Sequence, residues 1–114
     1  MDKIIWISYD LGIGGDYEGL YTWLDNNKAI ECGDSLACLK FSISHDNDDE
    51  LIQKVKQEIL SNVKTDAKSR IYIIRRVVDN GRSKVSGKFI CGKRKGNPWD
   101  GYGNKDDLTN DDSE

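Results

Sequence analysis

The chain has no apolar run long enough to cross a membrane. A membrane-spanning helix needs about 20 predominantly apolar residues, whereas the apolar run near the N-terminus, residues 4–7, ends at Ser8. That run is also shorter than the apolar core of a secretory signal. The sequence therefore predicts a cytoplasmic protein that does not enter the membrane.

Histidine and cysteine are also scarce. The three cysteines, Cys32, Cys38 and Cys91, have no CxxC spacing, and His45 is the one histidine. A structural zinc site needs four ligands at short, recognisable spacing. We therefore expect buried free thiols in a reducing compartment. Because His45 lies in a polar run, residues 44–50, the sequence also argues against a Ser–His or Cys–His nucleophile.

Negative charge is concentrated at the C-terminus. The chain carries a net charge of −3, and residues 105–114 alone contain five acids and one lysine, a net charge of −4. The remaining 104 residues therefore carry +1, so the acidic pI of about 5.2 does not exclude a nucleic-acid partner. Residues 104–114 have one apolar side chain, Leu108. We expect one domain over residues 1–103 and a disordered acidic tail over residues 104–114.

Apolar patterning predicts five strands, over residues 3–9, 28–32, 35–43, 70–78 and 84–91. Residues 3–9 are apolar at successive positions, which is typical of a central strand covered on both faces. Residues 35–43 alternate, with Ala37, Leu39, Phe41 and Ile43 on one face. Asn80-Gly81 indicates a hairpin between the last two strands, with a loop that we expect to exceed two residues.

Two helices are predicted between these strands. Asp16 is a suitable N-cap for the first, which should end near Asn26-Asn27. The polar run of residues 44–50 should open the second helix, with Asp46 as its cap. Its buried stripe is expected to be Leu51, Ile52, Val55, Ile59 and Val63. The order is βαββαβ with an extra C-terminal strand. It predicts an α+β fold of ferredoxin-like type, with two helices on one face of an antiparallel sheet.

Asp10 is the first candidate for chemistry, because it ends the first strand and precedes a glycine-rich loop. A carboxylate held there is suited to a divalent metal such as Mg²⁺, which can activate water against a phosphodiester. One aspartate is too little, so a second carboxylate would have to come from Asp16, Asp34 or a partner chain. The alternative interpretation is that Asp10 caps the loop by accepting backbone N–H bonds.

The C-terminal third is basic and contains aromatic residues. Nucleic-acid contacts are predicted for eight residues: Arg75, Arg76, Arg82, Lys84, Lys88, Lys93, Arg94 and Lys95. The alternative is a solvated edge strand, because lysines on edge strands also block aggregation. Trp99 and Tyr102 follow, and their rings would either stack on bases or anchor a subunit interface. A further alternative is that the segment around Trp99 binds the acidic tail, which would then compete with nucleic acid.

Short motifs in the first half of the chain point to a family. They are Ile-Ser-Tyr-Asp-Leu at residues 7–11, Asp16-Tyr17 at a helix start, and Gly33-Asp34-Ser35 before the alternating strand. Together with the following βαβ unit they resemble the small CRISPR-associated, spacer-acquisition superfamily, in particular its SinR-like branch and the related virulence-associated protein D group. The resemblance covers roughly residues 3–92.

The resemblance implies a ferredoxin-like fold and a homodimer in which each last strand packs against the partner's sheet. It also implies that Asp10 holds a metal across the dimer interface in those members that are metal-dependent nucleases. Two hypotheses follow. One is a dimeric protein that binds RNA or DNA, with Mg²⁺-dependent cleavage by paired Asp10 carboxylates. The other is a non-enzymatic interaction domain, a subunit or inhibitor of a larger complex with a protein partner.

Overall fold

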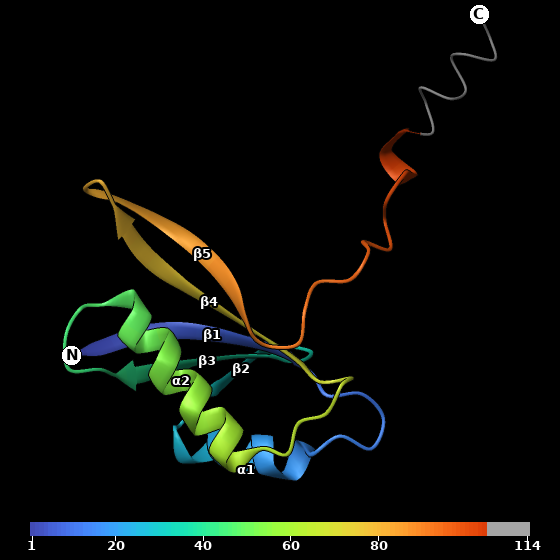
Figure 1. Cartoon of the computed structure of the whole chain (residues 1–114), viewed down its shortest axis with the longest axis horizontal. Helices are drawn as coiled ribbons and strands as arrows, with labels where there is room; N and C mark the ends of the chain where they lie inside the picture. The colour runs from blue at the N-terminus through green and yellow to red at the C-terminus, as the bar shows by residue number, and fades with distance from the viewer. Residues whose placement is uncertain (105–114) are drawn as a thin grey trace, which may run out of the picture.

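The computed structural model describes residues 1–104, which form one five-stranded sheet and two α-helices (Figure 1). The elements in chain order are β1 Asp2–Asp10, α1 Tyr17–Asn26, β2 Ile30–Gly33, β3 Leu36–Ser42, α2 Asp48–Asn62, β4 Arg70–Asp79, β5 Arg82–Cys91 and the 3₁₀ turn η1 Tyr102–Asn104. All strand pairs are antiparallel, in the order β2-β3-β1-β4-β5. The predicted α+β class is confirmed. The expected tail falls almost wholly on residues 105–114, outside the described residues.

Both helices cover the same face of the sheet (Figure 1). The helix-covered face of the sheet is apolar because alternate strand residues point to it. Its buried side chains include Ile5, Ile7, Ala37, Leu39, Phe41, Ile71 and Ile73, and the predicted stripe of α2 (Leu51, Ile52, Val55, Ile59 and Val63) is buried against them. The pattern-based prediction of this core is confirmed. No helix within residues 1–104 is long and apolar enough to span a membrane.

The opposite face of the sheet, here called the open face, is covered by no helix of residues 1–104 (Figure 1). β1 is central, between β3 and β4, as predicted. Its odd-numbered residues Ile5 and Ile7 are fully buried, but on the open face Ile4 is 44% exposed and Trp6 and Ser8 are half-buried. The expectation that both faces of β1 are covered is therefore wrong for the part of the chain that the structure describes. An apolar row continues across the open face in register, through Ile30, Cys38, Trp6 and Ile74.

The β4–β5 hairpin is tighter than expected. Asp79 pairs with Arg82, so the turn consists of Asn80 and Gly81 alone. Their φ angles of 52° and 75° are those of a type I′ turn, whose twist matches the flanking strands. β1 pairs with β4 only as far as Arg75. The hairpin therefore projects beyond the rest of the sheet (Figure 1).

Polar capping differs from the prediction at one of the two helices. Asp16 caps α1, since its Oδ1 accepts a hydrogen bond from the Gly19 N–H at 2.9 Å. Asn47, not Asp46, caps α2 by accepting a hydrogen bond from the Glu50 N–H at 3.0 Å. Asp46 instead forms an ion pair with Lys3, and its position one residue earlier leaves the cap to Asn47.

The cysteines are also less enclosed than predicted. Cys32 is exposed on the edge strand β2, and Cys38 and Cys91 are half-buried. Cys91 packs against the edge of the apolar layer between sheet and helices. Cys38 lies on the open face, in register with Trp6. The expectation of buried thiols is wrong.

Candidate functional site

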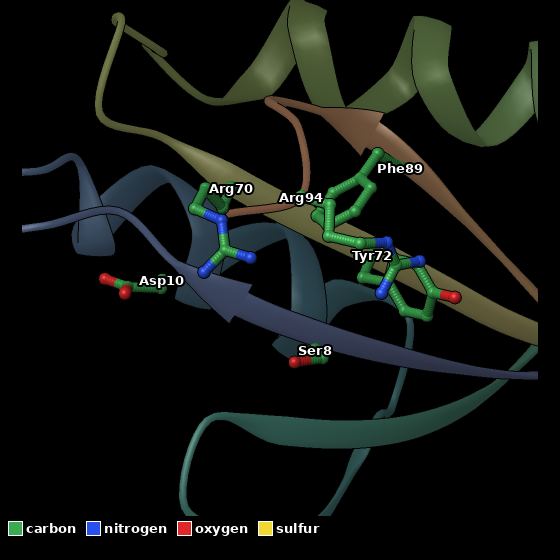
Figure 2. A pocket seen from close by; sticks show the side chains of 6 residues that line it. All are labelled: Ser8, Asp10, Arg70, Tyr72, Phe89 and Arg94. Atoms are coloured by element: carbon green, nitrogen blue, oxygen red, sulfur yellow. The ribbon is translucent and has the colours of Figure 1, made fainter. Parts of the chain in front are cut away.

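A pocket of about 250 Å³ lies on the open face where β1 ends. It is lined by Ser8, Asp10, Arg70, Tyr72, Phe89 and Arg94, and we call it the arginine pocket (Figure 2). Five of these residues come from β1, β4 and β5. Arg94 comes from the segment that follows β5.

Strand register brings the pocket residues together. Asp10 is paired with Arg70, Ser8 with Tyr72, and Tyr72 with Phe89. Residues paired across antiparallel strands project to the same face, and alternate residues along a strand share that face. The pocket therefore extends over three adjacent strands as a direct consequence of the pairing.

The two rings in the pocket form an edge-on pair that contacts both arginines. The Tyr72 and Phe89 centroids are 4.7 Å apart with an interplanar angle of 67°. The Arg70 guanidinium carbon is 5.5 Å from the Phe89 centroid, and that of Arg94 is 5.7 Å from Phe89 and 5.9 Å from Tyr72. These distances are within the range of cation–π attraction. The rings therefore position both cations.

Gly87 leaves room for the Tyr72 ring. A Cβ atom on Gly87 would overlap the Tyr72 hydroxyl and ring carbons, because the ring lies across β5 at this position. The backbone of Gly87 is extended, so the glycine is required by space and not by a positive φ. The absence of a side chain on β5 thus sets the orientation of a pocket ring.

Neither pocket arginine has an acidic partner within residues 1–104. The ion pairs in this part of the chain are Lys3–Asp46, His45–Glu50, Arg75–Asp48 and Lys84–Asp79. Arg70 donates from Nε to the Lys93 carbonyl at 3.2 Å, which ties the segment after β5 to the start of β4. The two guanidiniums thus leave N–H donors directed into a solvent-accessible hollow.

Asp10 lies at the rim of the pocket beside Arg70, and its carboxylate points away from that guanidinium (Figure 2). Asp10 Oδ1 accepts a hydrogen bond from the Gly12 N–H at 3.0 Å. This is the loop-capping contact that formed the alternative interpretation of Asp10, and it is confirmed. It leaves the other carboxylate oxygen at the pocket rim.

Residues 1–104 of one chain do not supply a magnesium site around Asp10. Within the described residues, no three histidine, cysteine or acidic side chains form a group able to hold a metal ion. Asp16 is committed to the N–H groups of Gly19 and Lys64, at 2.9 and 2.8 Å. These two bonds hold the pKa of Asp16 below its ordinary value, the Lys64 bond more strongly. Asp34 lies in the turn between β2 and β3. This turn is held beside the end of β1 by a hydrogen bond from the Tyr9 N–H to the carbonyl of Ser35, the next residue, at 3.0 Å.

Arg75 was predicted to contact nucleic acid, and this prediction is wrong. Its side chain points to the helix-covered face and is 5% exposed. Nε and Nη2 donate to the two carboxylate oxygens of Asp48 at 2.8 and 2.6 Å, and Nη1 donates to the Ser86 carbonyl at 3.1 Å. The bidentate bond lowers the pKa of Asp48 and raises that of Arg75. Arg75 therefore joins α2 to the sheet and is not available to a phosphate.

The other predicted cations lie on both sides of the sheet. Lys84 and Lys88 pair with Val77 and Ile73, so strand alternation places them on the helix-covered side. Arg76 is on the open face, near the hairpin tip, where it donates to the Ser83 hydroxyl. Arg82 is at the tip itself. Only Lys93, Arg94 and Lys95 lie in the segment next to the pocket.

Trp99 and Tyr102 lie on a segment that leads away from the sheet (Figure 1). They are 67% and 65% exposed. The Trp99 carbonyl accepts the Tyr102 N–H at 3.0 Å, which closes the turn that carries both rings. Their role at an interface stays a prediction.

Sequence reasoning did not assign Arg70, Tyr72 or Phe89 to the site. A signal was present in β4, where Arg70, Tyr72, Ile74 and Arg76 alternate with buried Ile71, Ile73 and Arg75. The register between β1 and β4, which brings Arg70 next to Asp10, is not readable from either strand alone.

Comparison of the chain with protein-family models, with curated proteins and with solved structures found no match. The site must therefore be interpreted from its own geometry.

Proposed function

We propose that the protein binds nucleic acid through the open face of its sheet, with the arginine pocket holding the sugar–phosphate backbone. The observation that supports this most is the pair of guanidiniums, Arg70 and Arg94, which have no acidic partner within residues 1–104 and lie against two aromatic rings. Arginine supplies planar donors that match phosphate oxygens, and aromatic rings beside them suit the bases. Lys93 and Lys95 flank Arg94 in the chain and add to the local positive charge.

The test is a binding titration of the full chain with labelled RNA and DNA oligonucleotides, read by fluorescence anisotropy. The variant Arg70→Gln/Arg94→Gln should lose at least tenfold in affinity, because each lost charged hydrogen bond costs roughly 1.5–3 kcal/mol. The control is Lys54→Gln/Lys56→Gln on the exposed side of α2, which removes the same charge from the other side of the molecule. Equal losses in the two double variants would count against the pocket.

The fold is proposed to be a ferredoxin-like variant. The order β2-β3-β1-β4 with two helices on one face is that of a βαββαβ unit, and β5 extends it at the β4 edge. This arrangement supports, by resemblance, the proposed relationship to the small CRISPR-associated, SinR-like and virulence-associated protein D group. The homodimer belongs to the same proposal. Light scattering of the purified chain tests it.

Mg²⁺-dependent cleavage of RNA or DNA is proposed only for a dimer. Within residues 1–104 a single chain presents one carboxylate, Asp10, to the pocket, so we propose that a metal would need the same residue of a second chain. Labelled RNA and DNA would be incubated with the protein in Mg²⁺ or Mn²⁺, beside Asp10→Ala. Cleavage that disappears with the substitution supports the proposal, and cleavage that persists unchanged rules Asp10 out.

A second candidate function is protein binding without catalysis. The exposed rings of Trp99 and Tyr102 favour it, because aromatic residues of this kind anchor interfaces. Trp99→Ala should then abolish capture of a partner from the native host and leave oligonucleotide affinity within about twofold. Loss of oligonucleotide affinity would assign Trp99 to the nucleic-acid surface instead.

A further inference from the structure

We infer that Arg70 and Arg94 form a clamp for a phosphodiester group of single-stranded nucleic acid, and that the Tyr72–Phe89 pair positions both guanidiniums. This inference rests on the proposed function and names its substrate class and the geometry of recognition. It separates these two arginines from Lys93 and Lys95, which flank Arg94 and add positive charge.

The first argument is that both arginines are oriented before any ligand binds. Arg70 is secured at Nε by the Lys93 carbonyl and lies 5.5 Å from the Phe89 centroid. Arg94 contacts both rings, at 5.7 and 5.9 Å. A side chain that is already ordered loses less entropy when it binds. The rings thus reduce the cost of ordering two long side chains.

The second argument is chemical. A guanidinium stacked on a ring keeps its in-plane N–H groups available, and these match two oxygens of a phosphate. The bond from Arg70 to Lys93 uses only Nε. A lysine at either position would retain the charge, but it would lose the planar fork and the stacking.

The third argument concerns the strand type. The pocket is a hollow of about 250 Å³, and the half-buried ring of Trp6 is on the same face, two residues along β1 from Ser8. A single strand can direct unpaired bases at such rings while its phosphate enters the hollow. In a duplex the bases are paired and stacked inside, so the rings would have no base faces to contact. We therefore expect a single strand to be preferred.

The decisive variants conserve charge. Arg70→Lys and Arg94→Lys are each expected to lower the affinity for a labelled 12-nucleotide single strand about tenfold, as the loss of one bidentate contact predicts. Arg82→Lys at the tip of the same hairpin, outside the arginine pocket, is the control and should change affinity less than about twofold. Pocket variants that bind as tightly as Arg82→Lys would overturn the clamp.

A second pair of variants changes no charge at all. Gly87→Ala pushes the Tyr72 ring out of place, and we expect a loss of at least fivefold in affinity, roughly the effect of misplacing one charged contact. Gly96→Ala adds a methyl group in open space and should bind like the wild type. Circular dichroism confirms folding in each case. A folded Gly87→Ala protein of wild-type affinity would show that ring position does not matter.

The outcomes separate the two proposals. If the wild type binds neither single strands nor duplexes of the same sequence, the proposed function fails and the clamp fails with it. If it binds but tolerates lysine at both positions, only the clamp fails. If duplexes bind as tightly as single strands, the assignment to single strands is wrong.

Discussion

Gly19 shows how a single missing side chain sets the distance between two helices. A Cβ atom there would overlap the carboxylate of Asp16 and the carbonyl oxygen of Asn62 at the end of α2. Gly19→Ala should destabilise the protein by about 1–3 kcal/mol, the usual cost of overpacking, although alanine is the better helix former. Urea unfolding would measure the loss. Gly96→Ala, in open space, is the control, and equal stabilities of the two variants would contradict the close approach.

The role of a side chain was predictable from the sequence where it depends on residues nearby in the chain. It was not predictable where it depends on the register between paired strands. The cap of α1 by Asp16 and the loop contact of Asp10 both involve N–H groups two or three residues ahead. The surroundings of Arg75 and Arg70 depend on residues that are far away in the chain. Arg75 forms an ion pair with Asp48, and Arg70 lies opposite Asp10 in the strand register. Adjacent arginines at positions 75 and 76 look equivalent in sequence, yet alternation along β4 buries one and exposes the other.

At the level of elements, the Asp48–Arg75 pair joins the start of α2 to β4. Asp48→Asn would leave the Arg75 guanidinium buried without its countercharge. We expect a loss of about 2 kcal/mol, less than the ~3–5 kcal/mol for breaking a fully buried pair, because the Asp48 side chain is 36% exposed. Asp49→Asn in the same helical turn is the exposed control. Thermal unfolding of both variants measures the difference.

The same pair predicts how stability depends on pH. The pKa of Asp48 is lowered in the folded protein, first by its hydrogen bond to Arg75, from an ordinary value of 3.8. Its contribution is therefore fully present above pH 3.8 and is lost as the pH falls through the lower folded pKa. Unfolding measured from pH 6 to pH 2 should show a shallower acid loss for Asp48→Asn than for the wild type. Parallel curves would contradict the coupling.

Helices and strands with one apolar face were predictable from the sequence. The residues at which they begin and end were less predictable. Each buried stripe satisfies a periodicity that is visible in sequence, which is why the helices and the alternating strand β3 were found. The predicted hairpin loop is longer than the observed one. Strand pairing continues to Asp79 and Arg82, and these two polar residues give no apolar pattern that would mark them as part of a strand.

At the scale of the whole molecule, the segment after β5 contributes to the pocket but not to the core. Residues 92–103 are all exposed. A chain ending at residue 92 should therefore unfold within about 2 °C of the wild type, because little apolar area is lost, and it should bind oligonucleotides more weakly because Arg94 is gone. A chain ending at residue 104 removes a net charge of −4 and is the control, expected to bind at least as tightly as the wild type. Equal binding by both truncated chains would contradict a role for Arg94.

The open face is what sequence patterning could least predict. Successive apolar residues in β1 are typical of a strand buried on both sides. One side nevertheless carries Ile4, Trp6 and Ser8, and no helix among the described residues covers it. Both helices pack on the other face because their apolar stripes match it. An apolar run does not by itself distinguish a buried surface from one that is kept open.

The most direct test is the salt dependence of oligonucleotide binding. For single strands, log affinity falls with log salt concentration by about 0.7 per phosphate contact. If Arg70 and Arg94 each neutralise one phosphate, Arg70→Gln/Arg94→Gln should reduce the slope by about 1.4 relative to the wild type, and Lys54→Gln/Lys56→Gln should leave it unchanged. A double pocket variant with the wild-type slope would contradict phosphate binding by the arginine pocket.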